Sequence, residues 1–217
     1  MTHPLEPALR EGATALGLGL SDAQIAQLLA YLALIQKWNQ VYNLTAVRDP
    51  AEMMSHHLLD SLAVIRPLLQ QTGGRSLRFL DVGSGAGLPG VVVAICCPGW
   101  QVDCADTVAK KAAFVQQVAA TLPLSNLRGL HARVESLSGP YDVVASRAFA
   151  SLSDFVTWSA PALGEGGLWM ALKGRQPHDE IAALPATVKV FHVEQLVVPG
   201  LGAERCIVWL RRASGVT

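Results

Sequence analysis

The fold of this chain is decided by the stretch Phe79-Leu80-Asp81-Val82-Gly83-Ser84-Gly85-Ala86-Gly87-Leu88-Pro89-Gly90. An apolar run ends in an acid, and glycines then follow at every second position before a proline. Glycine is needed where a backbone turns sharply, takes a positive φ, or lies against a ligand with no room for a Cβ. The stretch therefore predicts a strand, a glycine-rich turn and a helix, an arrangement typical of nucleotide-type cofactor sites.

Two classes of cofactor compete for this turn. The spacing Gly85-x-Gly87-x-x-Gly90 matches the dinucleotide fingerprint, in which a pyrophosphate lies at the helix N-terminus. Asp81 argues against a dinucleotide, because a carboxylate here would repel a pyrophosphate but attract the ammonium of a methionine moiety. Asp106 ends the next expected strand at the roughly 20-residue offset of a ribose-binding carboxylate, and it suits either cofactor. The sequence therefore favours S-adenosylmethionine, which carries an ammonium, a sulfonium and no phosphate.

Composition bounds the class of protein. A chain of 217 residues can build one sizeable core with a small appendage, and 51% hydrophobic against 16% charged residues argues against disorder. Formal net charge is zero, so any contact with RNA must come from a local patch. No apolar run reaches ~18 residues, and the first residues lack a secretory signal. We therefore expect no membrane association and a cytoplasmic location.

The four cysteines form no C-x-x-C pair, and no histidine cluster accompanies them. Zinc ligands usually occur in such close pairs. We therefore expect buried free thiols and no metal.

Strand and helix patterns alternate after Gly73-Gly74, and two helices are expected before it, over 21–38 and 49–67. This alternation predicts an α/β fold, Rossmann-like, with a mostly parallel seven-stranded sheet and a C-terminal antiparallel hairpin. We expect an N-terminal helical extension, 1–74, packed on a cofactor-binding domain, 75–217. The expected strands are 77–82, 101–105, 127–132, 141–146, 168–173, 188–198 and 206–211, and the expected helices 89–97, 108–122, 153–163 and 178–184.

Several runs carry a more specific resemblance. They are Tyr42-Asn43-Leu44-Thr45-Ala46-Val47-Arg48-Asp49-Pro50, His57-Leu58-Leu59-Asp60-Ser61, Asp81–Gly90, Ser146-Arg147-Ala148-Phe149-Ala150-Ser151-Leu152 and Ala171-Leu172-Lys173-Gly174. From about Leu28 to Trp209 the chain resembles the bacterial RsmG family, also called GidB. Its members are 16S ribosomal RNA guanine-N7 methyltransferases with a class I S-adenosylmethionine-dependent fold. The glycine turn is shared by methyltransferases in general, whereas the first and fourth runs make the match specific.

The resemblance implies cofactor contacts within the glycine turn, just after the third expected strand and just after the fourth, and it places the ribose hydroxyls on Asp106. Together with the turn itself, the expected cofactor-binding residues are Asp81, Gly83, Gly85, Leu88, Asp106, Val134, Glu135 and Arg147.

Guanine N7 has an in-plane lone pair and no proton to lose, so no general base is expected. Catalysis would then rest on alignment with the sulfonium methyl. The candidates that position the substrate are Arg147, Asn43 and Lys173, with Arg48 beside Asn43. Arg147 could reach guanine O6 or an RNA phosphate. It could instead pair with Asp142 or Glu135 and only shape the cofactor pocket.

We expect His56, His57 and Asp60 to belong to a helix that packs on the core, although either histidine could face the RNA. The expected partner is 16S ribosomal RNA within the small ribosomal subunit, and the protein is expected to be a monomer. Three other readings stay open. These are a methyltransferase with another substrate, a non-catalytic cofactor-binding assembly factor, and a dinucleotide-linked oxidoreductase.

Overall fold

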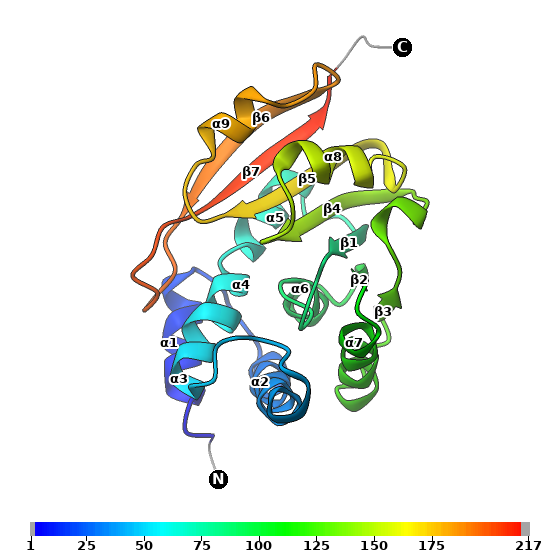
Figure 1. Ribbon diagram of the computed structural model, residues 1–217. Coiled ribbons are helices and arrows are strands. Elements are labelled where there is room, and N and C mark those ends of the chain that lie inside the picture. The colour runs from blue at the N-terminus through cyan, green and yellow to red at the C-terminus, as the bar shows by residue number, and fades with distance from the viewer. Residues whose placement is uncertain (1–2, 214–217) are drawn as a thin grey trace.

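The computed structural model of the chain describes residues 3–213. Seven strands form one sheet in the order β3-β2-β1-β4-β5-β7-β6 (Figure 1). The first five strands in this order pair in parallel, and β7 runs antiparallel to both β5 and β6. The fold class expected from the sequence is therefore confirmed. The strands are β1 (Arg78–Val82), β2 (Gln101–Asp106), β3 (Leu127–His131), β4 (Tyr141–Arg147), β5 (Leu163–Lys173), β6 (Val188–Leu196) and β7 (Arg205–Arg212).

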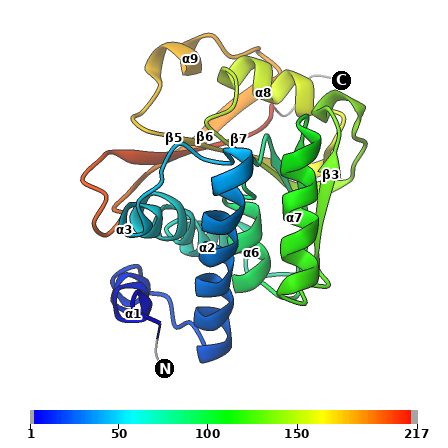
Figure 2. The ribbon, with the colours of Figure 1, turned by 60° about the horizontal axis from the view of Figure 1, so that its bottom comes forward.

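Helices cover both faces of the sheet (Figure 2). On one face lie α6 (Gly90–Cys96) and α7 (Ala109–Thr121), and on the other α8 (Leu152–Ser159) and α9 (His178–Ala182). Side chains alternate between the faces along a strand, so Phe79 packs into one apolar cluster and Leu80 into the other. Strand order reverses between β1 and β4. Ligands of such sheets bind outside the carboxyl ends of the strands at that point.

The N-terminal helices pack on the face that carries α6 and α7. They are α1 (Glu6–Ala15), α2 (Asp22–Tyr42), α3 (Pro50–Met53), the π-helix η1 (Met54–Leu59), α4 (Asp60–Leu62) and α5 (Ile65–Thr72). Buried side chains of these helices, such as Leu9 and Leu32, share one apolar cluster with Val92 of α6 and Val115 of α7. A domain boundary at residue 74 stays a prediction.

Three differences from the expected elements have a local physical cause. Helix α1 was not anticipated, because only Leu9, Gly12 and Ala13 of its residues are buried and the apolar stripe is short. The helix expected over 49–67 is interrupted by η1, and Pro67 lies in the first turn of α5, where no intrahelical N–H bond is lost. Strand β5 begins at Leu163, five residues before the expected start, because Gly164 and Gly166-Gly167 conceal the strand pattern.

Candidate active site

Two adjoining cavities lie at the carboxyl ends of the parallel strands, and Gly83 lines both of them. The first, of about 340 Å³, contains Arg147 and Arg205 and is called here the arginine cavity. The second, of about 610 Å³, contains Asp106 and is called the Asp106 cavity. A ligand that spans both cavities must therefore pass over the start of the glycine turn.

Positive φ angles shape the glycine turn. Gly83, Gly85 and Gly87 have φ of 65°, 59° and 85°. A Cβ on Gly87 would lie 2.5 Å from the side chain of Val91, whereas a Cβ on Gly85 would meet nothing within 4 Å. The backbone of the turn therefore approaches the core at Gly87 and has open space at Gly85, as a ligand cradle requires.

The carboxylate of Asp106 is fixed by the backbone at the end of β2. Its Oδ2 accepts a 3.0 Å hydrogen bond from the Gly85 N–H, and its Oδ1 accepts a 2.9 Å bond from the Val108 N–H. Each carboxylate oxygen can accept more than one hydrogen bond, so both remain competent to bind ribose hydroxyls.

Asp81 lies behind the turn and is fully buried, outside the residues that line the two cavities. Its Oδ2 accepts a 2.8 Å hydrogen bond from the Gly90 N–H. Burial raises the pKa of Asp81 to about 7, against the opposing effect of the Gly90 bond. Oδ1 of Asp81 and Oγ of Ser84 have no hydrogen-bond partner within residues 3–213. These two unmatched oxygens beside the turn fit a cofactor that carries an ammonium group.

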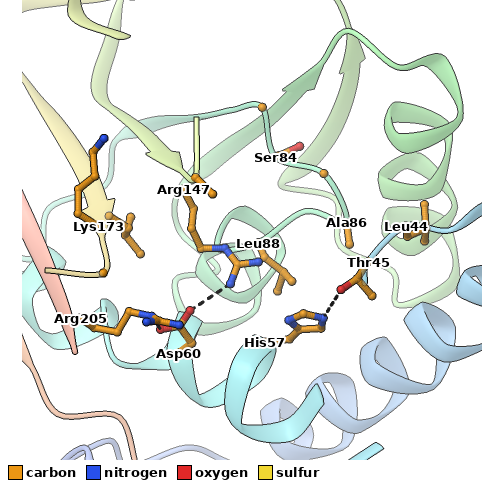
Figure 3. Close-up of a pocket in the computed structure, with 15 residues that line it drawn as sticks. Leu44, Thr45, His57, Asp60, Ser84, Ala86, Leu88, Arg147, Lys173 and Arg205 are labelled. Atoms are coloured by element: carbon orange, nitrogen blue, oxygen red, sulfur yellow. Dashed lines mark hydrogen bonds and ion pairs between the residues drawn. The ribbon is translucent and has the colours of Figure 1, made fainter. Parts of the chain in front are cut away.

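A network of charged side chains forms one wall of the arginine cavity (Figure 3). Asp60 accepts hydrogen bonds from Arg147 Nη1 at 3.1 Å and from Arg205 Nε at 2.9 Å. Arg147 Nη1 also donates to the carbonyl oxygen of His56 at 3.2 Å. The side chain of Asp60 is 3% exposed, and each arginine is 25% exposed. The buried Asp60 carboxylate therefore holds both arginines, while part of each guanidinium group faces the cavity.

Two further pairs border the same cavity. His57 and Thr45 share a 2.8 Å hydrogen bond between Nε2 and Oγ1, and burial lowers the pKa of His57, which favours the neutral ring. Lys173 donates to both carboxylate oxygens of Glu180 in α9, at 3.0 and 2.8 Å. The Lys173 ammonium is therefore anchored at the end of β5 and is not a free strand-end charge.

Aromatic side chains also line the Asp106 cavity. Phe149 and Trp158 pack edge to face, with centroids 5.9 Å apart and an interplanar angle of 86°. Phe149 also lies against the backbone of Gly83. Val134 and Glu135 line the same cavity, and the Glu135 side chain accepts a 3.1 Å hydrogen bond from Arg133.

The structure brings most of the expected site residues together. Gly83, Gly85, Leu88, Arg147 and Lys173 line the arginine cavity, and Asp106, Val134 and Glu135 line the Asp106 cavity. Asp81 and Asn43 line neither, although Asn43 directly precedes Leu44 and Thr45, which do line the arginine cavity. The individual roles of these residues stay predictions.

Two details of Asn43 and Arg147 came only from the structure. Asn43 Oδ1 accepts a 3.3 Å hydrogen bond from Arg48, which lines a separate pocket beside α2. The suggested pairing of Arg147 with Asp142 or Glu135 is wrong. Asp142 accepts from the Arg78 N–H, and the partner of Arg147 is Asp60.

Sequence reasoning missed Arg205, Phe149 and Trp158, and it assigned Asp60 to helix packing. Asp60 and Arg205 lie 145 residues apart, so no local pattern joins them. The signal that was available is an acid within an otherwise apolar helical run, because a buried carboxylate needs a partner. Within residues 3–213 no group of three or more histidine, cysteine, aspartate or glutamate side chains could hold a metal ion.

Comparison with solved structures defines the fold. TrmN from Thermus thermophilus superposes with a TM-score of 0.57 and 22% identity, covering 70% of this chain and 48% of that chain. A SAM-dependent methyltransferase from Aquifex aeolicus superposes with a TM-score of 0.55 and 15% identity, covering 82% of this chain and 97% of the other. The fold is that of the S-adenosylmethionine-dependent methyltransferases.

Comparison of sequences defines the family. The family model GidB, described as rRNA small subunit methyltransferase G, matches residues 24–208. This chain is 68% identical to the protein called ribosomal RNA small subunit methyltransferase G of Acidovorax ebreus (strain TPSY), over 95% of each chain. It is 67% identical to the protein of the same name of Albidiferax ferrireducens, over 97% of this chain and 98% of that one. The chain belongs to the GidB family and is an S-adenosylmethionine-dependent methyltransferase.

None of the helices within residues 3–213 combines the length and the apolar character needed to span a bilayer.

Proposed function

We propose that this protein transfers the methyl group of S-adenosylmethionine to N7 of one guanine in 16S ribosomal RNA. The observation that carries the proposal is the junction at Gly83, where a cavity suited to adenosine meets one that is walled by arginines and a lysine. Membership of a family described as rRNA small subunit methyltransferase G supports RNA as the substrate.

The chemistry of the arginine cavity supports N7 as the acceptor. When bound, the cofactor supplies an electrophilic methyl group. The guanine N7 lone pair can attack it without losing a proton, so a general base is not required. Among the described residues that line the cavity, the titratable side chains that could serve as a base already have partners within the protein, and the one ring nitrogen without a partner, His57 Nδ1, is buried. Asp60 is held by two arginines, Lys173 is paired with Glu180, and His57 Nε2 is bonded to Thr45.

Residue roles follow from position. Asp106 would hold the ribose hydroxyls, and Val134 and Glu135 would border the adenine. Gly83, Gly85 and Leu88 would cradle the methionine moiety, with Asp81 behind them. Arg147 and Lys173 would position the RNA from one side of the arginine cavity, and Asn43 from the loop opposite. Alignment of two bound reactants accounts for up to ~7–11 kcal/mol of a barrier, so positioning alone can drive such a transfer.

The proposal extends to the setting of the reaction. The chain has a formal net charge of zero, which favours a structured substrate over any single strand, because phosphate contacts alone would supply little affinity. We therefore propose the small ribosomal subunit, whole or partly assembled, as the substrate. The protein would act in the cytoplasm as a monomer without a metal ion, with residues 1–74 as a helical extension of the methyltransferase domain.

The test uses S-adenosylmethionine labelled in its methyl group and small ribosomal subunits that lack the modification. The extracted RNA is reduced and treated with aniline, which cuts at 7-methylguanosine. We expect label in 16S RNA and one discrete cut. Label without a cut would refute N7, and the absence of label despite cofactor binding would favour a non-catalytic assembly role. Protein-free 16S RNA methylated as fast as subunits would refute the subunit as substrate.

A further inference from the structure

Asp60 joins three parts of the fold that are remote in sequence. It follows the π-helix η1, and its carboxylate accepts from Arg147 at the end of β4 and from Arg205 at the start of β7. These three residues all line the arginine cavity, and Figure 3 shows both guanidinium groups directed at the Asp60 carboxylate.

The π-helix contributes a second contact to the same group. The wider turn of a π-helix is rare and is frequently found at functional sites. Here it presents the carbonyl oxygen of His56 to the Nη1 atom of Arg147, which also reaches Asp60. The orientation of Arg147 is therefore fixed by two acceptors from one short segment.

The charges in this cluster do not cancel. Two guanidinium groups share one carboxylate, which leaves one net positive charge on the wall of the cavity. Within residues 3–213, Nε and Nη2 of Arg147 and Nη2 of Arg205 make no hydrogen bond to the protein. Planar guanidinium donors suit the several oxygens of a phosphate better than a single carbonyl oxygen.

We propose that Asp60 is a positioning residue for the RNA substrate. Its carboxylate holds Arg147 and Arg205 together as one singly charged unit, and the unused N–H groups of that unit receive a phosphate beside the target guanine. This inference rests on the proposed function, because it takes RNA to be the substrate. Asp60 touches neither reactant and acts through the two arginines.

If Asp60 positions the two arginines, removal of its charge should affect the affinity for RNA and the rate of methyl transfer in different ways. In Asp60→Asn the cavity gains one positive charge, so its electrostatic attraction for RNA does not weaken. The amide oxygen can still accept from one arginine, but the amide nitrogen cannot accept from the other. The repulsion between the two guanidinium groups is no longer offset by a shared carboxylate, so the target guanine is misaligned. Replacement of a residue with a structural role alone would instead lower the folded fraction, and activity and RNA binding would then fall together.

The experiment measures kcat, KM for small subunits, and the affinities for S-adenosylmethionine and for 16S RNA over a series of salt concentrations. For Asp60→Asn we expect kcat to fall at least about tenfold, since small misplacements are costly in an aligned reaction. KM for subunits should stay level or fall, and cofactor affinity should stay within about threefold. The slope of log affinity for RNA against log salt should steepen by up to about 0.9, as one added charge requires.

Asp103→Asn is the matched control. Asp103 is buried to the same degree as Asp60 and paired with Arg128 at 2.7 Å, yet it lines neither cavity. It should lower stability to a similar extent while kcat of the folded protein is kept. Arg205→Gln is the second variant, in case Asp60→Asn does not fold. It neutralises the unit, so the salt slope should become shallower by up to about 0.9. Asp60→Glu should recover part of kcat.

The inference is overturned if Asp60→Asn loses no more kcat than Asp103→Asn, or if its cofactor affinity falls in parallel with kcat. A salt slope that Arg205→Gln leaves unchanged would also overturn it. Failure of the proposed function would have a different result, because the wild-type protein would then transfer no methyl group to RNA. In that case the salt slopes of RNA binding still decide the inference, because they need no turnover.

Discussion

The hydroxyl group of Tyr31 in α2 donates a 2.6 Å hydrogen bond to the carbonyl oxygen of Ala86 in the glycine turn. Tyr31 is fully buried, and Ala86 lines the arginine cavity. Burial raises the pKa of Tyr31 well above its usual value, so the phenol stays a neutral donor. An N-terminal helix therefore fixes the cofactor turn directly, 55 residues away along the chain.

Replacement of Tyr31 with phenylalanine should destabilise the protein and weaken cofactor binding. The variant leaves the Ala86 carbonyl oxygen without its buried donor, which costs about 1–3 kcal/mol. We expect a loss of that size in urea denaturation, together with a several-fold weaker affinity for S-adenosylmethionine by calorimetry. Tyr42→Phe, which alters a tyrosine that is 40% exposed, is the control and should change neither quantity. Equal behaviour of the two variants would show that the Ala86 contact is unimportant.

Replacement of Asp106 with asparagine should act mainly on the cofactor. The carboxylate accepts from the Gly85 and Val108 N–H groups, and an amide nitrogen placed toward either one cannot accept. We expect at least a tenfold loss of affinity for S-adenosylmethionine, or about 1.4 kcal/mol, by calorimetry. Asp103→Asn, on the same strand but outside both cavities, should bind the cofactor normally. An unchanged dissociation constant for Asp106→Asn would remove Asp106 from the cofactor site.

Asp81 makes stability depend on pH. Burial raises its pKa from 3.8 to about 7 in the folded protein, so the folded state binds more protons than the unfolded state between these values. The contribution of Asp81 to the free energy of unfolding is then present at low pH and is lost as pH rises toward 7. Asp81→Asn removes this loss. Its stability relative to wild type should increase from about pH 4 to pH 7, by an amount on the order of 3–4 kcal/mol, and then level off.

The measurement is urea denaturation of both proteins without cofactor at a series of pH values. Only the difference between them reports on Asp81, because other groups titrate equally in both. Parallel stability curves over this range would mean that Asp81 ionises normally in the folded protein.

The sequence predicted the parts of this structure whose causes are local. The strand at Arg78–Val82, the glycine turn and the helix after it follow from apolar runs, residues that tolerate positive φ and alternating patterns. Helix α2 likewise begins within one residue of the expected start at Ser21, where a Ser21–Gln24 capping box closes its first turn. In each case the residues responsible lie within a few positions of one another.

The parts that escaped prediction depend on tertiary contacts. The Asp60 network requires strands β4 and β7 and helix η1 to meet, and nothing in the sequence states which arginine faces which acid. Likewise, the ion pair between Lys173 and Glu180 forms only because α9 turns back toward the end of β5. The site could thus be located from the sequence, but the pairing of its charges could not.

Gly83 and Gly85 offer a matched test of the junction between the two cavities. Both have φ near 60°, so an alanine at either position carries the left-handed strain of roughly 1–2 kcal/mol. Only at Gly83 would the new Cβ meet a side chain, at 2.7 Å from Phe149 Cδ2, whereas at Gly85 it would meet nothing within 4 Å. Gly83→Ala should therefore destabilise the protein more than Gly85→Ala in urea denaturation. Phe149→Ala should remove that excess when it is combined with Gly83→Ala, as a double-mutant cycle measures. An excess that persists without the Phe149 ring would place its cause in the backbone instead.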